Sequence, residues 1–233
     1  MNYTILDASN DFADLSNSLG RFKEELCKEK NLDFRSQDFR LVFLDTIQQY
    51  LLSLTSYIRA FIGLQQLVSP AEFLKILNVG ISTIEEYEES RIIYKFPIES
   101  LITMIHFQID SFLGEICRLK GSPQTGFYKR MKMVLDEIEI ETGKKEEYLN
   151  TLQCLAFFRN SFHNKGFHSI YKGKWKEGIE PQKGEIDRKF AAKESTIVFK
   201  HNELITYNWR SVFLLIKESV ESLRFLTKAL NVQ

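Results

Sequence analysis

The sequence has few cysteines, no signal-peptide pattern and no long uninterrupted run of apolar residues. Its three cysteines, Cys27, Cys117 and Cys154, are odd in number and lie far apart in apolar helical patterns. Such cysteines are usually buried free thiols, which argues against a disulfide scaffold and favours a reducing compartment. The start, residues 1–7, lacks basic and apolar signal regions, and polar residues interrupt the longest apolar stretch, 41–68. We therefore expect a soluble cytoplasmic protein without a membrane partner.

The chain also lacks an excess of charge and the common cofactor motifs. Lys and Arg together number 31, as do Asp and Glu, so contact with a nucleic acid has to depend on local charge. No C-x-x-C, H-E-x-x-H, phosphate-binding glycine loop or dinucleotide fingerprint is present. The glutamate pairs Glu85/Glu89 and Glu137/Glu141 lie one helical turn apart without a Glu-x-x-His pattern, so we interpret them as solvated faces. We expect no metal and no cofactor.

Apolar residues recur at the three- and four-residue spacing of an amphipathic helix along most of the chain. The clearest stripe follows the candidate caps Asp7 and Ser9 and consists of Phe12, Leu15, Leu19, Phe22 and Leu26. Ser36, Pro97 and Asn208 stand where longer helices are expected to begin. The expected helices cover residues 7–26, 36–62, 97–121, 126–141, 145–164 and 208–230, with short pieces after 69–70 and over 82–94.

The region from residue 165 to residue 207 differs from the rest because it is rich in glycine. Within it, Ser195–His201 has the β-branched enrichment of a strand, and Ile205–Tyr207 is the expected partner strand. Thr142-Gly143 predicts a break between two helices. No repeat or linker divides the chain, so residues 1–233 are expected to form one domain. The predicted fold is an all-α bundle of about five main helices, with a small β-hairpin insertion before the last helix.

The most informative segment is Phe157–His168, where a helical pattern ends at a glycine. Arg159 and His163 are four residues apart, so on a helix they share one face. A fixed guanidinium beside a group that titrates near neutral pH suits the handling of a phosphodiester. The segment therefore predicts a site that acts on a phosphate group.

This arrangement of an arginine, a following polar residue and a histidine near the end of a core helix resembles the HEPN superfamily, whose active members are metal-independent ribonucleases. Arg159, Asn160 and His163 match the pattern in residue type and placement. Three residues separate Arg159 from His163, one fewer than the usual minimum in the family, and Asn164 stands where the commonest spacing places the histidine. The resemblance is specific over residues 155–168 and architectural elsewhere.

The resemblance implies a metal-independent endoribonuclease of the toxin or phage-defence type that acts as a homodimer. In such an enzyme the RNA 2′-hydroxyl attacks the adjacent phosphate. His163 is then expected to act as general base or acid, Arg159 to stabilise charge on the phosphoryl oxygens, and Asn160 to donate a positioning hydrogen bond. An antitoxin or another protein is a further expected partner.

A basic and aromatic stretch follows the motif. Between Arg159 and Lys176 there are basic and aromatic side chains but no acidic residue. Basic groups follow a phosphate backbone, and exposed aromatic rings stack on unpaired bases. The alternative is a solvated lysine loop whose aromatic residues attach it to the core. The residues expected to contact RNA are Lys165, His168, Lys172, Lys174, Trp175 and Lys176.

Structural roles remain open for the same residues. Arg159 could pair with a buried carboxylate such as Asp110, while His163 could interact with the helix dipole. His106 lies among apolar residues and is interpreted as a core histidine whose hydrogen bonds are satisfied. The competing functional hypotheses are a catalytically inert HEPN-like module that binds RNA, a nucleotide or a protein partner, and a purely structural helical dimer.

Overall fold

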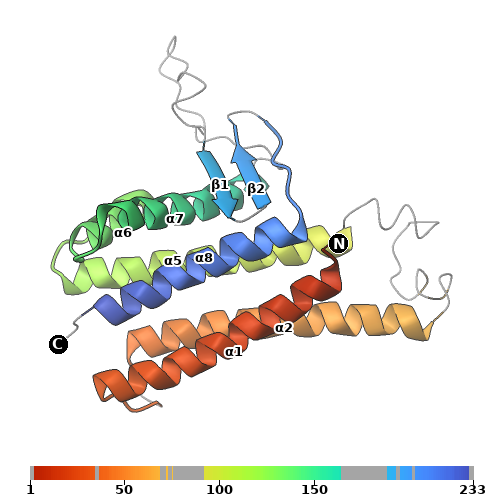
Figure 1. The fold of residues 1–233 in the computed structure, drawn as a ribbon, viewed down its shortest axis with the longest axis horizontal. Coiled ribbons are helices and arrows are strands. Elements are labelled where there is room, and N and C mark those ends of the chain that lie inside the picture. Colours follow the sequence, from red (N-terminus) through yellow and green to blue (C-terminus); the bar gives the residue numbers. More distant parts are fainter. Residues whose placement is uncertain are drawn as a thin grey trace, which may run out of the picture.

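The computed structural model describes residues 3–34, 37–68, 72, 75, 92–163, 188–192, 195–200 and 203–230. These residues form long helices and one antiparallel hairpin (Figure 1). The prediction of an all-α bundle with a small hairpin before the last helix is confirmed. The elements in chain order are α1 (Ile5–Lys30), α2 (Phe39–Leu67), α5 (Ile92–Leu119), α6 (Phe127–Asp136), α7 (Thr142–His163), β1 (Arg188–Ala192), β2 (Ser195–Phe199) and α8 (Trp209–Ala229).

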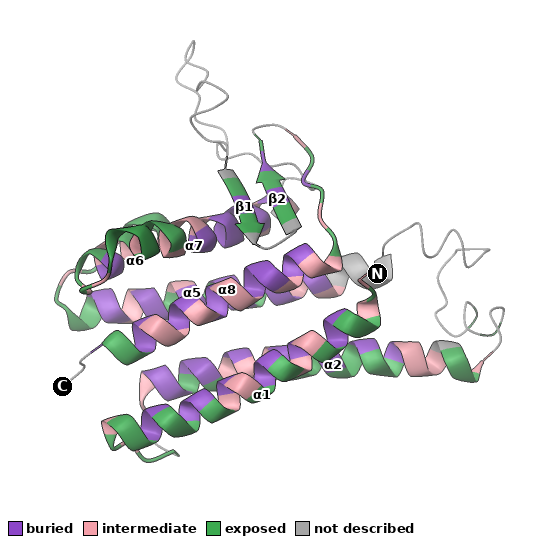
Figure 2. Cartoon of the chain, viewed as in Figure 1, coloured by how far each residue is buried: buried purple, intermediate pink, exposed green. Residues whose placement is uncertain are grey.

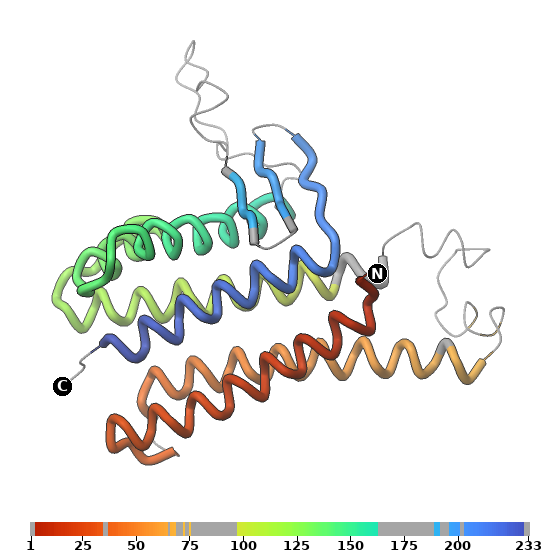
Figure 3. Tube along the Cα trace, viewed as in Figure 1, coloured from red at the N-terminus to blue at the C-terminus, as the bar shows by residue number. Residues whose placement is uncertain are grey.

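The helices pack in three successive pairs, which the tube in Figure 3 shows most clearly. The α1 and α2 helices lie side by side, α8 and α5 form the middle pair, and α7 and α6 lie on the far side of it. Contacts between α1 and α8 and between α2 and α5 join the first two pairs. The hairpin packs on α7 and α8, so it covers the end of the bundle where α7 ends.

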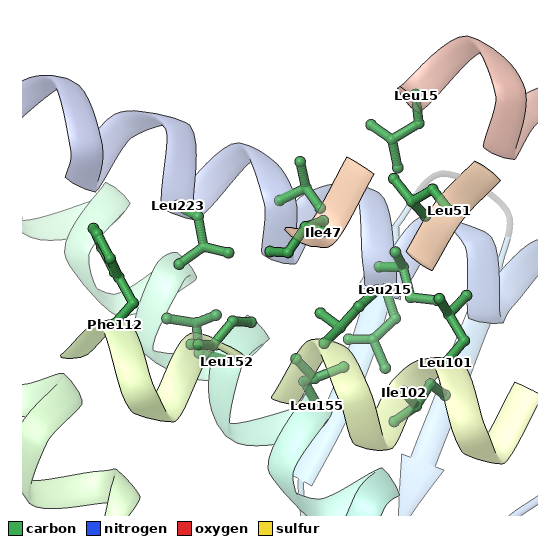
Figure 4. Packing of buried hydrophobic residues seen from close by; sticks show 14 of the residues in the cluster. Leu15, Ile47, Leu51, Leu101, Ile102, Phe112, Leu152, Leu155, Leu215 and Leu223 are labelled. Atoms are coloured by element: carbon green, nitrogen blue, oxygen red, sulfur yellow. The ribbon is translucent and has the colours of Figure 1, made fainter. Parts of the chain in front are cut away.

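One continuous apolar core joins these pairs. Purple, buried segments face neighbouring helices in Figure 2, and the green, exposed segments face away. The narrow stripe predicted for the first helix is confirmed, because all five of its apolar residues are buried. Each fully buried side chain of this size contributes about 1.5–3 kcal/mol. Figure 4 shows the contact between layers, where core residues from different helices meet: Leu15, Ile47, Leu51, Leu101, Ile102, Leu155 and Leu215.

Hydrogen bonds at the helix starts place them differently from the predicted caps. The α1 helix begins at Ile5 because Thr4, rather than Asp7 or Ser9, is its cap. The Thr4 backbone N–H donates to Asp7 over 2.7 Å, and the Thr4 hydroxyl accepts from the Asp7 backbone N–H over 3.2 Å. This reciprocal pair is a capping box, in which the third helical residue supports the cap. Asp7 therefore supports the start of the helix from the third helical position, whereas the sequence predicts it at the cap position.

Two predicted helix starts in the middle of the chain lie a few residues after the observed ones, although separate helices form on both sides of residues 137–141 as expected. Pro97 lies inside α5 rather than at its start. A proline there removes one helical hydrogen bond, which the packing of this long helix tolerates. Gly143 lies in the first turn of α7, and α6 ends earlier than expected, at Asp136. Backbone N–H groups in a first turn have no partner within the helix, so glycine costs only its backbone entropy there.

The strand that pairs with residues 195–199 in the hairpin differs from the expected partner strand. Ser195–Phe199 forms a strand as predicted, but it pairs with Arg188–Ala192 instead of residues 205–207. In this register Phe190 lies opposite Ile197, and both side chains are buried against the helices. The final helix follows, and the predicted Asn208 cap is confirmed.

Several predicted features lie outside the described residues. They include the acidic segment at 82–91 and the insertion from 164 to 187, and only two isolated positions of the predicted short helix after 69–70 are described. In the parts of the chain that the structure describes, no helix combines the length and apolarity needed to cross a membrane.

Candidate functional site

The end of α7 is held in place by a cluster of aromatic side chains. Phe158 is fully buried, and its ring centroid lies 4.8 Å from the ring centroid of Tyr207 and 6.3 Å from that of Phe199. Phe162 packs on Phe158 with ring centroids 5.2 Å apart. Phe162 is therefore part of this cluster. The cluster joins α7 to β2 and to the segment before α8, which fixes the backbone of the next residue, Arg159.

Arg159 is half-buried, and its guanidinium lies over the ring of Phe107, 5.0 Å from the ring centroid. Phe107 comes from α5 and is 47% exposed, so the guanidinium is held where α5 and α7 reach the surface. Its Nη1 donates to the Asn160 side-chain oxygen over 2.8 Å. Its Nε is buried and has no hydrogen-bond partner among the described residues. A guanidinium has five N–H donors, so this arrangement leaves donors for a ligand.

Asn160 orients the arginine. The sequence predicted that Asn160 donates a hydrogen bond to a phosphate or to the histidine, whereas the structure shows its Oδ1 accepting from Arg159. An amide that uses its oxygen in this way keeps its NH2 group as a donor. The structure thus brings Arg159 and Asn160 together at one site.

The other predicted site residues are not placed by the structure. His163 is the last residue of α7, but its side chain lies outside the described residues, so its position relative to Arg159 stays a prediction. The six residues expected to contact RNA also lie outside the described ranges. They are Lys165, His168, Lys172, Lys174, Trp175 and Lys176.

The site includes a histidine that sequence reasoning did not connect to Arg159. His106 on α5 is only 7% exposed, and its ring centroid lies 4.5 Å from the ring centroid of Phe127 and 6.1 Å from that of Phe107. Its burial was predicted correctly. The expectation that its hydrogen bonds are satisfied was wrong, because Nδ1 is buried without a partner in the described part of the chain.

Charge and burial keep the His106 imidazole neutral. Burial lowers its pKa to about 4, and the positive charge of Arg159 contributes in the same direction. The Asp110 carboxylate opposes both effects but does not outweigh them. At neutral pH the site therefore combines a permanent cation with an uncharged imidazole.

Asp110 is not the partner of Arg159. Its Oδ1 accepts a hydrogen bond from Nη1 of Arg130 over 2.8 Å, and Arg130 also donates through Nε to the Gln124 carbonyl over 2.9 Å. The predicted alternative of an Arg159–Asp110 pair is thus wrong, because Arg130 on α6 occupies the carboxylate. Among the described residues, Arg159 forms no ion pair with a carboxylate.

The cysteines match the interpretation of buried free thiols. Cys27, Cys117 and Cys154 are all buried, and none of them forms a disulfide. Burial raises the thiol pKa of both Cys27 and Cys117, which disfavours the reactive thiolate. Within the described ranges, no three His, Cys, Asp or Glu side chains come together in a way that could hold a metal ion.

A separate cavity of about 430 Å3 lies between α1 and α8. Its lining carries charges of both signs, including Asp14, Arg210 and Glu221. Tyr3 donates to Asp11 there over 2.6 Å, and burial together with this carboxylate raises the Tyr3 pKa. Because the charges are mixed, this cavity shows no preference for an anion. At the Arg159 site, by contrast, the cation has no carboxylate partner among the described residues.

Comparison with family models, with curated proteins and with solved structures finds no match to this chain. Its function therefore has to be inferred from the chemistry around Arg159. A guanidinium fixed by stacking and by a side-chain hydrogen bond, with unused donors at the surface, is suited to bind a phosphate group.

Proposed function

We propose that this protein is a metal-independent endoribonuclease of the toxin or phage-defence type, in which Arg159 binds the scissile phosphate. The observation that carries the proposal is the state of Arg159. Its guanidinium is stacked on Phe107 and bonded to Asn160, yet no described carboxylate neutralises it. Preorganised cationic donors are the groups that stabilise charge as it grows on phosphoryl oxygens.

The proposed reaction uses the RNA itself as the source of the nucleophile. The 2′-oxygen forms a bond to phosphorus while the bond from phosphorus to the 5′-oxygen breaks, which leaves a 2′,3′-cyclic phosphate and a 5′-hydroxyl. His163 accepts the proton of the 2′-hydroxyl or supplies one to the leaving oxygen, because its ordinary pKa lies near neutral pH. Arg159 stabilises the phosphoryl oxygens, and Asn160 keeps the guanidinium in position.

The HEPN resemblance supports further parts of the proposal. Two copies of the motif facing one cleft would make the enzyme a homodimer, with a protein partner such as an antitoxin controlling it. The stretch after α7 would bind the RNA backbone and its unpaired bases. The residues proposed for this contact are Lys165, His168, Lys172, Lys174, Trp175 and Lys176.

The test is cleavage of single-stranded RNA in EDTA by the wild type and by two variants, Arg159→Gln and His163→Gln. We expect Arg159→Gln to lower the rate about 10²–10³-fold, as the loss of one oxyanion donor does. The matched control is Arg118→Gln. Arg118 is an exposed arginine on α5, about 18 Å along the helix from His106, and its loss should leave the rate unchanged. Equal rates in all four proteins would contradict the role of Arg159.

The second candidate is a catalytically inert HEPN-like module that binds RNA, a nucleotide or a protein. It is favoured by the short spacing of Arg159 and His163. This candidate predicts no cleavage in EDTA but RNA binding that weakens steeply with salt. Simultaneous replacement of Lys172, Lys174 and Lys176 by glutamine should then weaken binding and flatten its salt dependence.

A further inference from the structure

Two buried nitrogen atoms that have no hydrogen-bond partner in the described part of the chain lie on neighbouring helices of the same site. One is Nε of Arg159 on α7 and the other is Nδ1 of His106 on α5. Both side chains contact the Phe107 ring, at centroid distances of 5.0 Å for the guanidinium and 6.1 Å for the imidazole. Buried polar atoms without partners are rare in folded proteins, and an absent ion is one explanation for them.

The charges around His106 show what kind of ion would suit the pair. Arg159 from α7 disfavours a proton on His106, whereas Asp110 from α5 favours one. Asp110 is partly neutralised by Arg130 from α6. No described group on α2 or α8 contributes to the pKa of His106. A single negative charge beside Arg159 would offset the guanidinium and so raise the proton affinity of the imidazole, while burial, the larger cause of its lowered pKa, would remain.

We propose that Arg159 binds a phosphate group at the surface beside His106, and that the bound phosphate group raises the affinity of the His106 imidazole for a proton. Arg159 contacts the phosphate, since its guanidinium lies at the surface over Phe107. His106 acts through charge as a positioning residue, because its Nδ1 is shielded from solvent. The inference deepens the proposed function, since it assigns a second residue beside the scissile phosphate. Binding of free phosphate tests it without requiring cleavage.

The experiment follows the His106 imidazole by NMR during a pH titration. The chain has four histidines, so the spectrum of His106→Gln assigns the His106 signals. The titration is run on the full chain without ligand, with inorganic phosphate, and with a short single-stranded 2′-O-methyl RNA that cannot be cleaved through a 2′-hydroxyl. Without ligand, we expect the His106 midpoint at about 4.

With phosphate, we expect the His106 midpoint to rise by about one pH unit or more, which is a roughly tenfold change in its proton affinity. Arg159→Gln should abolish this dependence on phosphate, and Arg118→Gln should retain it. Arg159→Lys, which keeps the charge but loses the planar set of donors, should show a smaller rise than the wild type, and this second variant keeps the test available if the glutamine variant does not fold. A midpoint that neither phosphate nor RNA moves would overturn the inference, as would an equal rise in Arg159→Gln.

The titrations with inorganic phosphate and with RNA distinguish a failure of this inference from a failure of the proposed function. A rise with inorganic phosphate but not with RNA supports a pocket for free phosphate and removes RNA as its ligand. A rise with both ligands supports a pocket that receives an RNA phosphate. Conversely, RNA cleavage in EDTA by a protein whose His106 midpoint is unchanged by phosphate and by RNA would sustain the nuclease and overturn the role of His106.

Discussion

Lowering the pH from about 7.5 to about 4.5 should destabilise the protein through His106 in particular. In the folded chain the pKa of His106 is lowered from 6.5 to about 4, with burial as the larger cause and Arg159 as the second. The unfolded chain therefore binds a proton at this residue below pH 6.5, whereas the folded chain does not until the pH approaches 4. Because the unfolded state holds more protons in this window, the free energy of unfolding decreases as the pH falls.

The size of the effect follows from the same two values. One pH unit of difference between the folded and unfolded pKa corresponds to about 1.4 kcal/mol. The full difference at His106 corresponds to about 3 kcal/mol, and most of it is lost by about pH 4.5. Well above pH 6.5 the imidazole is neutral in both states and contributes no pH dependence.

The assay is urea unfolding of the wild type and of His106→Gln at about pH 7.5 and about pH 4.5. Glutamine does not titrate, so the variant removes the His106 contribution and retains those of the carboxylates. We expect the wild type to lose about 2–3 kcal/mol more than the variant between the two pH values. An equal loss in both proteins would refute the account of His106 as a buried neutral imidazole.

Three further changes test the packing and the charges around the site. Asp110→Asn should lower the free energy of unfolding in urea by about 1 kcal/mol, because its ion pair with Arg130 is partly exposed. The same change should lower the His106 pKa further, which NMR measures, and an unchanged His106 midpoint would contradict this. Phe158→Ala should cost about 3–5 kcal/mol, since its ring is fully buried, and a cost below about 1 kcal/mol would contradict the aromatic cluster. Thr4→Ala should cost about 1 kcal/mol through loss of the α1 cap, and no cost would argue against that capping box.

Local patterns predicted the elements well because their physical causes are local. The apolar stripe of the first helix and the Asn208 cap both follow from spacing within one segment, and both are confirmed. Strand β1 was missed because Phe190 is its only large apolar residue, so the strand depends on pairing with β2. Pro97 in the sequence indicates a helix start, because the sequence does not show that packing allows a helix to continue through a proline.

The sequence predicts only those residues of the candidate site that lie together on one helix. Arg159 and Asn160 were found because they are adjacent on α7, and the structure shows them bonded. His106 was missed as a member of the site because its relation to Arg159 depends on how α5 and α7 align across the bundle. No sequence pattern in either helix indicates how α5 and α7 align with each other. The same reason explains why Asp110 was offered as a partner for Arg159 when it pairs with Arg130.

The proposed reaction requires that Arg159 serve an RNA-cleaving site in which the 2′-hydroxyl is the nucleophile. Its most direct test is to identify the chemical ends of the products when the purified protein cleaves single-stranded RNA in EDTA. We predict 2′,3′-cyclic phosphate and 5′-hydroxyl ends, with no cleavage at a position that carries a 2′-deoxyribose. Products with 3′-hydroxyl and 5′-phosphate ends, or uncleaved RNA, would contradict it.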